Sequence, residues 1–388
     1  MNINVTVGDD ETIYCNVQLI TPVVNIGMIG IKGDTGGIPS SGIPVSNGTD
    51  WVDSITATAE SDFILSGPSP FSWVKKTLAQ VKTILGLGDW SFWGIKNLRL
   101  IDVHAGDATR VIVNPSAYNI PILIGDHWHV MTSAVTVSSV DDLDTGSLAV
   151  GKDYYIYACT DGTTLSFKVS LNSTNPLGFD ANHSRKIGGF HTLCAAVGTI
   201  SGHTLTGYAQ KDILPASIWD LKHRAKCGNN AGMVYDPKSL VWVDIYLASG
   251  TGVSTASVNG ATTTDTRNWL DFVDDGGAVG KRLLTDPEFM MIAAGSNQGT
   301  SIAGAADPVT TGGHVDTAGR RMISSIGCED CCGTLWQWID YPSDANMLIA
   351  GGTWSSAASS GTRYRYAGYA RTEASYNNIG ARFVSEPL

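Results

Sequence analysis

The sequence has little charge, and positive charge is the scarcer kind. Charged residues make up 16% of the 388 positions, and 25 Lys and Arg stand against 36 Asp and Glu, which gives a net charge of −11. Such a protein is poorly suited to neutralise phosphates, so we expect no nucleic-acid partner. No apolar run approaches the length of a membrane span, and the opening residues alternate like strands rather than forming a secretory signal. We therefore expect no membrane insertion.

The cysteines lack the regular spacing of a disulfide framework. Seven is an odd number, and they are Cys15, Cys159, Cys194, Cys227, Cys328, Cys331 and Cys332. This pattern favours reduced thiols in a protein that folds in a cytosol. Cys328 and Cys331 form a C-x-x-C, but no second pair lies nearby at ligand spacing and no βαβ pattern precedes it. Buried structural thiols are thus favoured over a zinc site or a redox pair.

Motifs for catalysis are missing too. The sequence has no G-x-S-x-G, no phosphate-binding Gly loop followed by Lys, and no H-E-x-x-H. His127 and His129 share one face of a predicted strand, which is weak support for a metal. His191 in GGFH lies among apolar residues and is expected in the core. His314, near Asp316 in a Gly-rich loop, is either a turn residue or a site residue. We predict no enzymatic activity, no metal and no cofactor.

The N-terminal 95 residues predict a small β module followed by a helix. Ser69 and Pro70 are suited to begin a helix, and apolar residues then recur at a period near 3.6 until Gly86, so we predict a helix over 69–86. Its apolar face would pack in the core or against a sister chain. Gly27 to Gly36 carries Gly at period three. A Gly-rich turn region is favoured there over chains that wind around a threefold axis.

The rest of the chain predicts two further regions. Short alternating segments over 96–178 predict a β-sandwich of antiparallel strands. Residues 179–388 mix signals and predict a loop-rich α+β domain. Within it, Leu240 to Leu247 predicts a half-buried strand, and Cys332 to Ile339 predicts another. Thr285 and Glu288 form a capping box that predicts the start of a helix.

The residues 351–378, GGTWSSAASSGTRYRYAGYARTEASYNN, use a restricted alphabet. They contain no Leu, Val, Ile, Phe, Met or Lys. Tyr offers rigid contact area at low entropic cost, and Ser, Gly and Asn adapt their hydrogen bonds, as in antibody paratopes. Trp354 and the closing IGARF are typical of anchoring strands. We therefore favour a binding surface over a disordered tail.

Several stretches resemble one family. RKIGGFH (185–191), ILPASIWDL (213–221), RRMISSIGCEDCCGTLWQW (320–338), GGTW (351–354) and IGAR (379–382) resemble the major tropism determinants, receptor-binding proteins of phages with relatives encoded by diversity-generating retroelements. The resemblance spans about residue 140 to the end. It implies a mixed, mainly β fold: an N-terminal β-prism for trimerisation and virion attachment (1–95), a β-sandwich (96–178) and an α+β C-type lectin-like domain (179–388).

The resemblance also implies how the protein works. Its members assemble as intertwined homotrimers, so we expect a protein made in the host cytoplasm and carried at the tail-fibre tip of the virion. The expected partners are a host cell-surface protein or glycan receptor, whose recognition sets host tropism, and other tail-fibre proteins. In this family, randomisation at template adenines in AAY codons would explain the restricted alphabet of the segment 353–378, called the variable segment below.

The family pattern locates the variable, receptor-binding positions. By position they are Thr353, Ser355, Ser356, Ala357, Ser359, Tyr366, Gly368 and Tyr369, with Tyr364 as an additional site. The spacing to IGAR is one residue longer than the pattern, and within that stretch we choose Thr372, Ser375, Tyr376 and Asn378. The scaffold positions would be Trp354, Gly361, Arg363, Arg365, Arg371 and Arg382.

Two further expectations concern the fold around these sites. Because a randomised site must not carry the fold, we expect Tyr366 and Tyr369 to contribute little to stability, unlike the core residues Trp336 and Trp338. Strand alternation turns Arg363 and Arg365 away from Tyr364, toward acidic scaffold groups.

Three alternative functions remain. Formylglycine-generating enzymes resemble this scaffold, but they place Cys on both sides of an R-x-R, where this chain has Gly361 and Tyr366. A Ca²⁺-dependent lectin needs clustered carboxylates, whereas Glu373 stands alone in the variable segment. The last alternative is a purely structural tail-fibre protein, which would need no variable tip.

Overall fold

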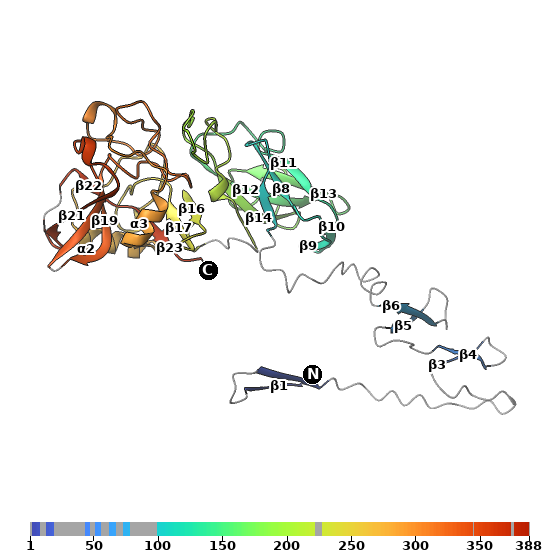
Figure 1. Ribbon diagram of the computed structural model, residues 1–388. Coiled ribbons are helices and arrows are strands. Elements are labelled where there is room, and N and C mark those ends of the chain that lie inside the picture. Colours follow the sequence, from blue (N-terminus) through green and yellow to red (C-terminus); the bar gives the residue numbers. More distant parts are fainter. Residues whose placement is uncertain are drawn as a thin grey trace. The chain divides into compact units, whose positions relative to one another are not determined.

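The computed structural model describes residues 99–221, 227–343, 345–373 and 376–387, together with the backbone of six strands between Asn2 and Thr77. The chain divides into two compact units, Met1–Val81 and Lys82–Leu388. In the first unit the strands form three antiparallel hairpins (Figure 1). These pair β1 (Asn2–Val7) with β2 (Ile13–Gln18), β3 (Ile43–Ser46) with β4 (Trp51–Ile55), and β5 (Asp62–Ser66) with β6 (Trp73–Thr77).

The helix predicted over 69–86 is wrong where the structure describes it. Trp73–Thr77 is strand β6, with Trp73 opposite Ser66 and Thr77 opposite Asp62 in the register with β5. Trp, Val and Thr favour strands, and pairing with β5 outweighs the helical spacing of the apolar residues. The remainder of 69–86 and the Gly-rich stretch 27–36 lie outside the described residues.

Residues 99–221 form three antiparallel sheets around one apolar core. The sheet orders are β13-β12-β14-β15, β11-β8-β7 and β10-β9. Side chains from strands of all three sheets, among them Val111, Ile122 and Ile156, are buried in one cluster. The strands are β7 (Ile101–Val103), β8 (Arg110–Val113), β9 (Ile120–Ile124), β10 (His127–Met131), β11 (Val135–Ser138), β12 (Asp153–Thr160), β13 (Leu165–Ser170), β14 (Ser184–His191) and β15 (Trp219–Asp220).

Strand pairing continues past residue 178, where the sequence analysis places a boundary. β14 pairs with β12 along its length, and β15 pairs with β14. The glycines of GGFH allow this close approach, because a Cβ at Gly188 would lie 2.3 Å from the Trp219 carbonyl oxygen. Asp220 then accepts hydrogen bonds from the N–H groups of Leu100 and Ile101, which ties both ends of the region together.

Residues 227–387 contain two four-stranded sheets with few helices (Figure 1). Their orders are β16-β17-β23-β18 and β21-β20-β19-β22. The first consists of β16 (Met233–Asp236), β17 (Val241–Asp244), β18 (Arg282–Leu283) and β23 (Phe383–Ser385). The second consists of β19 (Trp336–Ser343), β20 (Asn346–Gly351), β21 (Gly361–Ala370) and β22 (Ile379–Gly380). The described helices of this region are α2 (Trp269–Ala278), α3 (Asp286–Ile292) and the 3₁₀ turns η3 (Gly252–Ser254), η4 (Ala303–Ala305) and η5 (Ala357–Ser359), and a further 3₁₀ turn, η2 (Pro215–Ser217), precedes β15.

The predicted helix start at Thr285 is confirmed. Thr285 is the N-cap of α3, and the Glu288 carboxylate accepts from the Thr285 N–H at 2.8 Å, which completes a capping box. The prediction for Cys332 to Ile339 is confirmed only from Trp336 onward, since β19 begins there. No described helix is long and apolar enough to cross a membrane.

The strand in Leu240 to Leu247 is present as β17, but the prediction that it is half-buried is wrong. All four residues of Val241–Asp244 are buried. Val241 and Val243 pack into the large core, whereas Trp242 on the other face packs with Cys227 and Met233. The alternation in sequence therefore reflects two buried faces rather than one.

Candidate functional site

The variable segment is a surface layer anchored at both ends in one sheet. It leaves β20 after Gly351, passes through η5, runs along β21 and ends at β22 (Figure 1). Gly361 pairs with Gly351 on β20, and Ile379 pairs with Trp336 on β19. β21 is an edge strand, so one side of it faces no other strand of the sheet. This anchoring excludes a free tail for the described residues.

The first loop of the segment presents small polar groups. Ser355, Ala357 and Ser359 are exposed, and Ser356 is half-buried. Thr353 is different because only 3% of it is exposed. Its hydroxyl donates to the Thr334 carbonyl at 3.1 Å, so Thr353 lies beneath the surface and joins the loop to the core.

Three tyrosines of the segment form one aromatic cluster. The ring centroids of Tyr366 and Tyr369 are 5.5 Å apart, and those of Tyr369 and Tyr376 are 5.0 Å apart. Tyr366 and Tyr376 are 51% and 45% exposed, whereas Tyr369 is half-buried and packs against the core. We call Tyr366, Tyr369 and Tyr376 the tyrosine cluster.

A bulge in β21 brings the cluster together. Residues three apart normally point to opposite faces of a strand. Tyr366 lies opposite Ile349 and Tyr369 opposite Met347, so three steps on β21 match two on β20. The extra residue lets both rings lie side by side. Gly368 fits under Tyr366, because a Cβ there would lie 2.3 Å from the Tyr366 ring.

Tyr364 lies apart from this cluster, on the wall of a hollow. It is 39% exposed. The hollow has a volume of about 790 Å³, and its lining includes Gly202, Gln298, Arg320, Arg363 and Tyr364. Most of its lining lies outside the variable segment, in loops near residues 200, 295 and 320, and no sequence motif marked those loops as part of a site.

The two arginines beside Tyr364 differ in their surroundings. Arg365 forms the expected acidic contact, an ion pair with Asp286, and its guanidinium lies 4.9 Å from the Phe289 ring centroid. The same expectation is wrong for Arg363. That side chain is exposed and forms no ion pair with any residue the structure describes. Irregular pairing between Ala350 and Gly351 on β20 breaks the alternation there.

The end of the segment turns back into the sheet. Thr372 is exposed, and Asn378 is half-buried with its carbonyl accepting from the Trp336 N–H at 3.0 Å. Ser375 lies outside the described residues. The Glu373 carboxylate accepts from the Ala370 N–H at 3.0 Å, so it closes the turn after β21.

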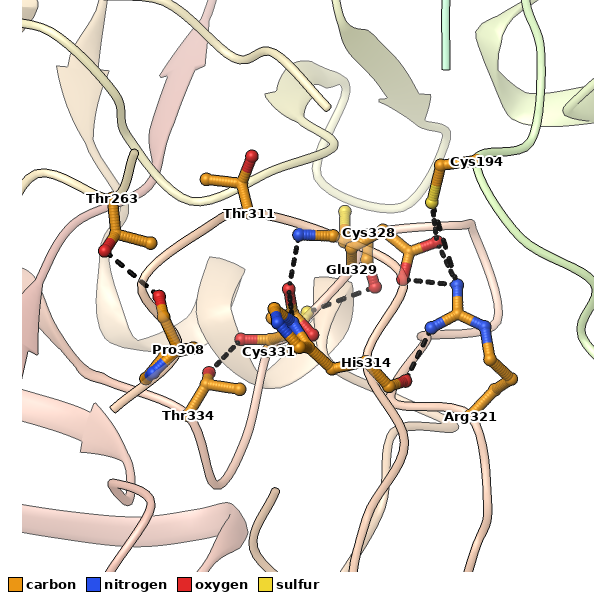
Figure 2. A network of polar contacts seen from close by, with 12 residues as sticks. Cys194, Thr263, Pro308, Thr311, His314, Arg321, Cys328, Glu329, Cys331 and Thr334 are labelled. Carbon is orange, nitrogen blue, oxygen red and sulfur yellow. Dashed lines mark hydrogen bonds and ion pairs between the residues drawn. The ribbon is translucent and has the colours of Figure 1, made fainter. Parts of the chain in front are cut away.

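Polar residues of the interior form a buried network rather than an open site (Figure 2). Arg321 donates to both oxygens of Glu329 at 2.6 and 2.7 Å, and the Cys194 thiol donates to Glu329 at 3.3 Å. His314 Nδ1 lies 2.9 Å from Asp330 Oδ2. The carboxylate partner of His314 is therefore Asp330 rather than Asp316, and the contact is structural.

The remaining candidates also have structural partners. His191 is buried, with Nδ1 2.8 Å from Asp153 and Nε2 3.0 Å from the Tyr246 hydroxyl, which confirms the predicted core histidine. His129 Nε2 lies 2.8 Å from the Thr160 hydroxyl. Within the described ranges no three His, Cys, Asp or Glu side chains gather as metal ligands.

The described cysteines are free and buried, as predicted. Burial raises the pKa of Cys194, and it raises the pKa of Cys159 to about 12. Thiols in such surroundings are protonated and shielded from reagents. Cys15 lies outside the described residues.

Comparisons with known proteins find similarity to phage receptor-binding proteins. The family model described as "Mtd second domain" matches residues 107–220. The tail fiber receptor-binding protein of Bordetella phage BPP-1 is 26% identical over 285 residues, which is 62% of this chain and 73% of that protein. The solved U1 and M1 variants of the Major Tropism Determinant each give a TM-score of 0.63 at 23% identity, covering 75% of this chain and 85% of theirs.

Proposed function

We propose that this chain, which contains an Mtd second domain and has the fold of the major tropism determinants, is a phage tail-fibre protein that binds a host surface receptor. The observation that carries the proposal is the placement of Tyr364, Tyr366 and Tyr376. All three are exposed on a segment that is anchored at both ends in one sheet. The receptor is a protein or glycan of the host surface, and its recognition sets host tropism.

The physical properties of this surface suit recognition. Tyr contributes a large contact area with few rotatable bonds, so little entropy is lost on binding. Ser355, Ala357 and Ser359 are small, exposed residues of the same segment, so they leave space for a partner. Aromatic residues at the centre of an interface commonly carry most of its energy. Sequence changes at these positions alter the contact surface while the sheet stays in place.

The wider architecture follows from the same proposal. Residues 99–221 serve as a β-sandwich, residues 227–387 as a C-type lectin-like domain, and the unit Met1–Val81 as a β-prism that trimerises and attaches to other tail-fibre proteins of the virion. In a homotrimer, three variable faces bind together and raise avidity by roughly 10² or more where the receptors can be spanned. Light scattering at micromolar concentration that reports a monomer would contradict this assembly.

No observation favours catalysis by a formylglycine-generating type of enzyme. That chemistry needs an accessible thiol. The thiols among the described residues are buried, and Gly361 and Tyr366 occupy the positions where those enzymes carry Cys.

The proposal is tested by adsorption of the trimer to host cells. Tyr366→Ala and Tyr376→Ala are each expected to weaken adsorption by about tenfold or more, since interface tyrosines of this kind contribute 2 kcal/mol or more, roughly. Tyr118→Ala is the matched control, because Tyr118 is also exposed but lies among residues 99–221. Unchanged adsorption of both variants, with loss in the control, would place the binding face elsewhere.

A further inference from the structure

The hollow beside Tyr364 is built from four separate parts of the chain. Its walls are the loop 200–203, the loop 294–299 that follows α3, the pair Arg320 and Ser325, and the start of β21 at Thr362–Tyr364. At about 790 Å³ it lies within the range of pockets that hold small ligands, roughly 300–1,000 Å³. Exposed Tyr364 of the variable segment forms part of its wall, so the hollow adjoins the proposed receptor surface.

Hydrogen bonds fix the walls to one another. The Gln298 side chain accepts from the Thr362 N–H at 3.1 Å, which joins the loop 294–299 to β21. Ser325 N–H donates to the Ala294 carbonyl at 2.8 Å, and His203 Nε2 lies 3.3 Å from the Ile323 carbonyl oxygen. A hollow held in this way needs little reordering when a ligand enters.

The charge of the hollow is opposite to that of the protein. The residues that line it include Arg320 and Arg363 but no Asp or Glu, although the whole chain carries −11. Arg320 donates to the backbone carbonyls of Gly295 and Arg321 rather than to a carboxylate. Asp316 is the acidic neighbour, and its carboxylate accepts from the backbone N–H of Arg320. Arg363 forms no ion pair within the described part of the chain.

We propose that this hollow is a subsite for a saccharide that bears a negative charge, a carboxylate or a phosphate. The inference rests on the proposed function, because the subsite forms part of the same receptor surface. Arg guanidinium groups match the geometry of these anions and form strong charge-assisted hydrogen bonds. The Tyr364 ring gives a sugar a flat apolar face, and Gln298 and Thr362 supply amide and hydroxyl groups. The fixed walls of the hollow thus recognise the negative charge of the ligand, and the variable positions recognise the part of the receptor around it.

Isothermal titration of the full-length protein tests this. The probes are trigalacturonic acid, glucose 6-phosphate, neutral maltotriose and the peptide triglutamate. We expect at least one of the two charged sugars, trigalacturonic acid and glucose 6-phosphate, to bind and maltotriose not to bind. Which charged sugar binds shows whether the subsite accepts a carboxylate, a phosphate or both. Arg363→Gln weakens that binding by about tenfold or more, the effect of removing one hydrogen bond to a charged group. The Arg363 side chain is exposed and forms no ion pair with the described residues, so this variant is expected to fold normally.

The matched control is Arg185→Gln, which removes one exposed positive charge from β14. We expect it to leave the affinity for the charged sugar unchanged. The subsite is overturned if neither charged sugar binds, if maltotriose binds equally well, or if triglutamate binds more tightly than the sugars. It is also overturned if Arg363→Gln leaves the affinity for the charged sugar unaltered. These results are independent of host adsorption.

If the subsite fails while Tyr366→Ala still abolishes adsorption, the proposed function stands. If the charged sugar binds while the tyrosine variants adsorb normally, the subsite stands and the proposed receptor surface falls.

Discussion

The ring of Tyr369 meets the buried ring of Trp338 edge-on, with 6.3 Å between centroids and 77° between planes. Tyr366 and Tyr376 pack on Tyr369 in turn, so aromatic contacts lead from the core to the exposed surface. Of the three rings of the tyrosine cluster, Tyr369 is the one with this core contact. A position that we predict to be variable is thus not automatically independent of the fold.

Tyr369→Ala is expected to lower the free energy of unfolding by about 1–3 kcal/mol, because it removes a partly buried ring and its contact with Trp338. Tyr366→Ala removes a more exposed ring and is expected to cost about 0.5 kcal/mol or little more. Urea denaturation followed by Trp fluorescence measures both. This revises the sequence-based expectation for Tyr369. Equal losses in the two variants would show that the core contact contributes nothing.

Trp338→Ala is expected to destabilise the protein by about 3–5 kcal/mol, since Trp338 is 1% exposed and fills the core beneath the sheet. Trp336 is half-buried, so Trp336→Ala is expected to cost less. Chemical denaturation of the two variants gives the comparison. A larger loss for Trp336→Ala than for Trp338→Ala would contradict this order.

His314 is expected to make stability depend on pH. Burial favours its neutral ring, but the charge and hydrogen bond of Asp330 outweigh burial and raise the pKa of His314 above its usual value. A raised pKa in the folded state stabilises the fold fully below the unfolded value of about 6.5. This contribution is lost as pH rises through the folded pKa.

The comparison with His314→Gln isolates that contribution. The difference in unfolding free energy between the native protein and the variant is expected to be larger at about pH 5.5 than at about pH 9. His203, whose pKa burial lowers, is present in both proteins and cancels in the difference. A difference that stays constant or grows toward high pH would exclude a charged His314–Asp330 pair.

The buried thiols are expected to resist modification while the protein is folded. The six cysteines that the structure describes are buried, and the pKa of Cys159 is raised to about 12 by burial. Ellman's reagent at about pH 8 should therefore titrate at most one thiol in the native state, Cys15, and all seven in urea, because unfolding restores ordinary thiol reactivity. Rapid native reaction of a second thiol would show that one of the described cysteines is accessible.

Local features of the chain were predictable where a short stretch is sufficient to define them. The capping box at Thr285 and Glu288 depends on residues three apart, and the helix begins there. Short alternating runs within 96–178 predicted several of the strands found there, among them β8, β11, β12 and β13, because side chains alternate between the two faces of a strand. The restricted alphabet of the variable segment led to the prediction of a binding surface, since it is a paratope-like set of residues, and this stays a prediction.

The tertiary structure decided what depends on residues far apart in the chain. The apolar period near Trp73 predicted a helix, yet pairing with β5 made it a strand. Val241 and Trp242 are both buried because distant segments cover opposite faces of β17. The sequence could not separate Thr353 in the interior from Ser355 at the surface, and it gave no sign that Arg320 and Arg363 share one hollow. Torsional preference and periodicity act within a few residues, whereas burial and charge proximity are set by whichever segments the fold brings together.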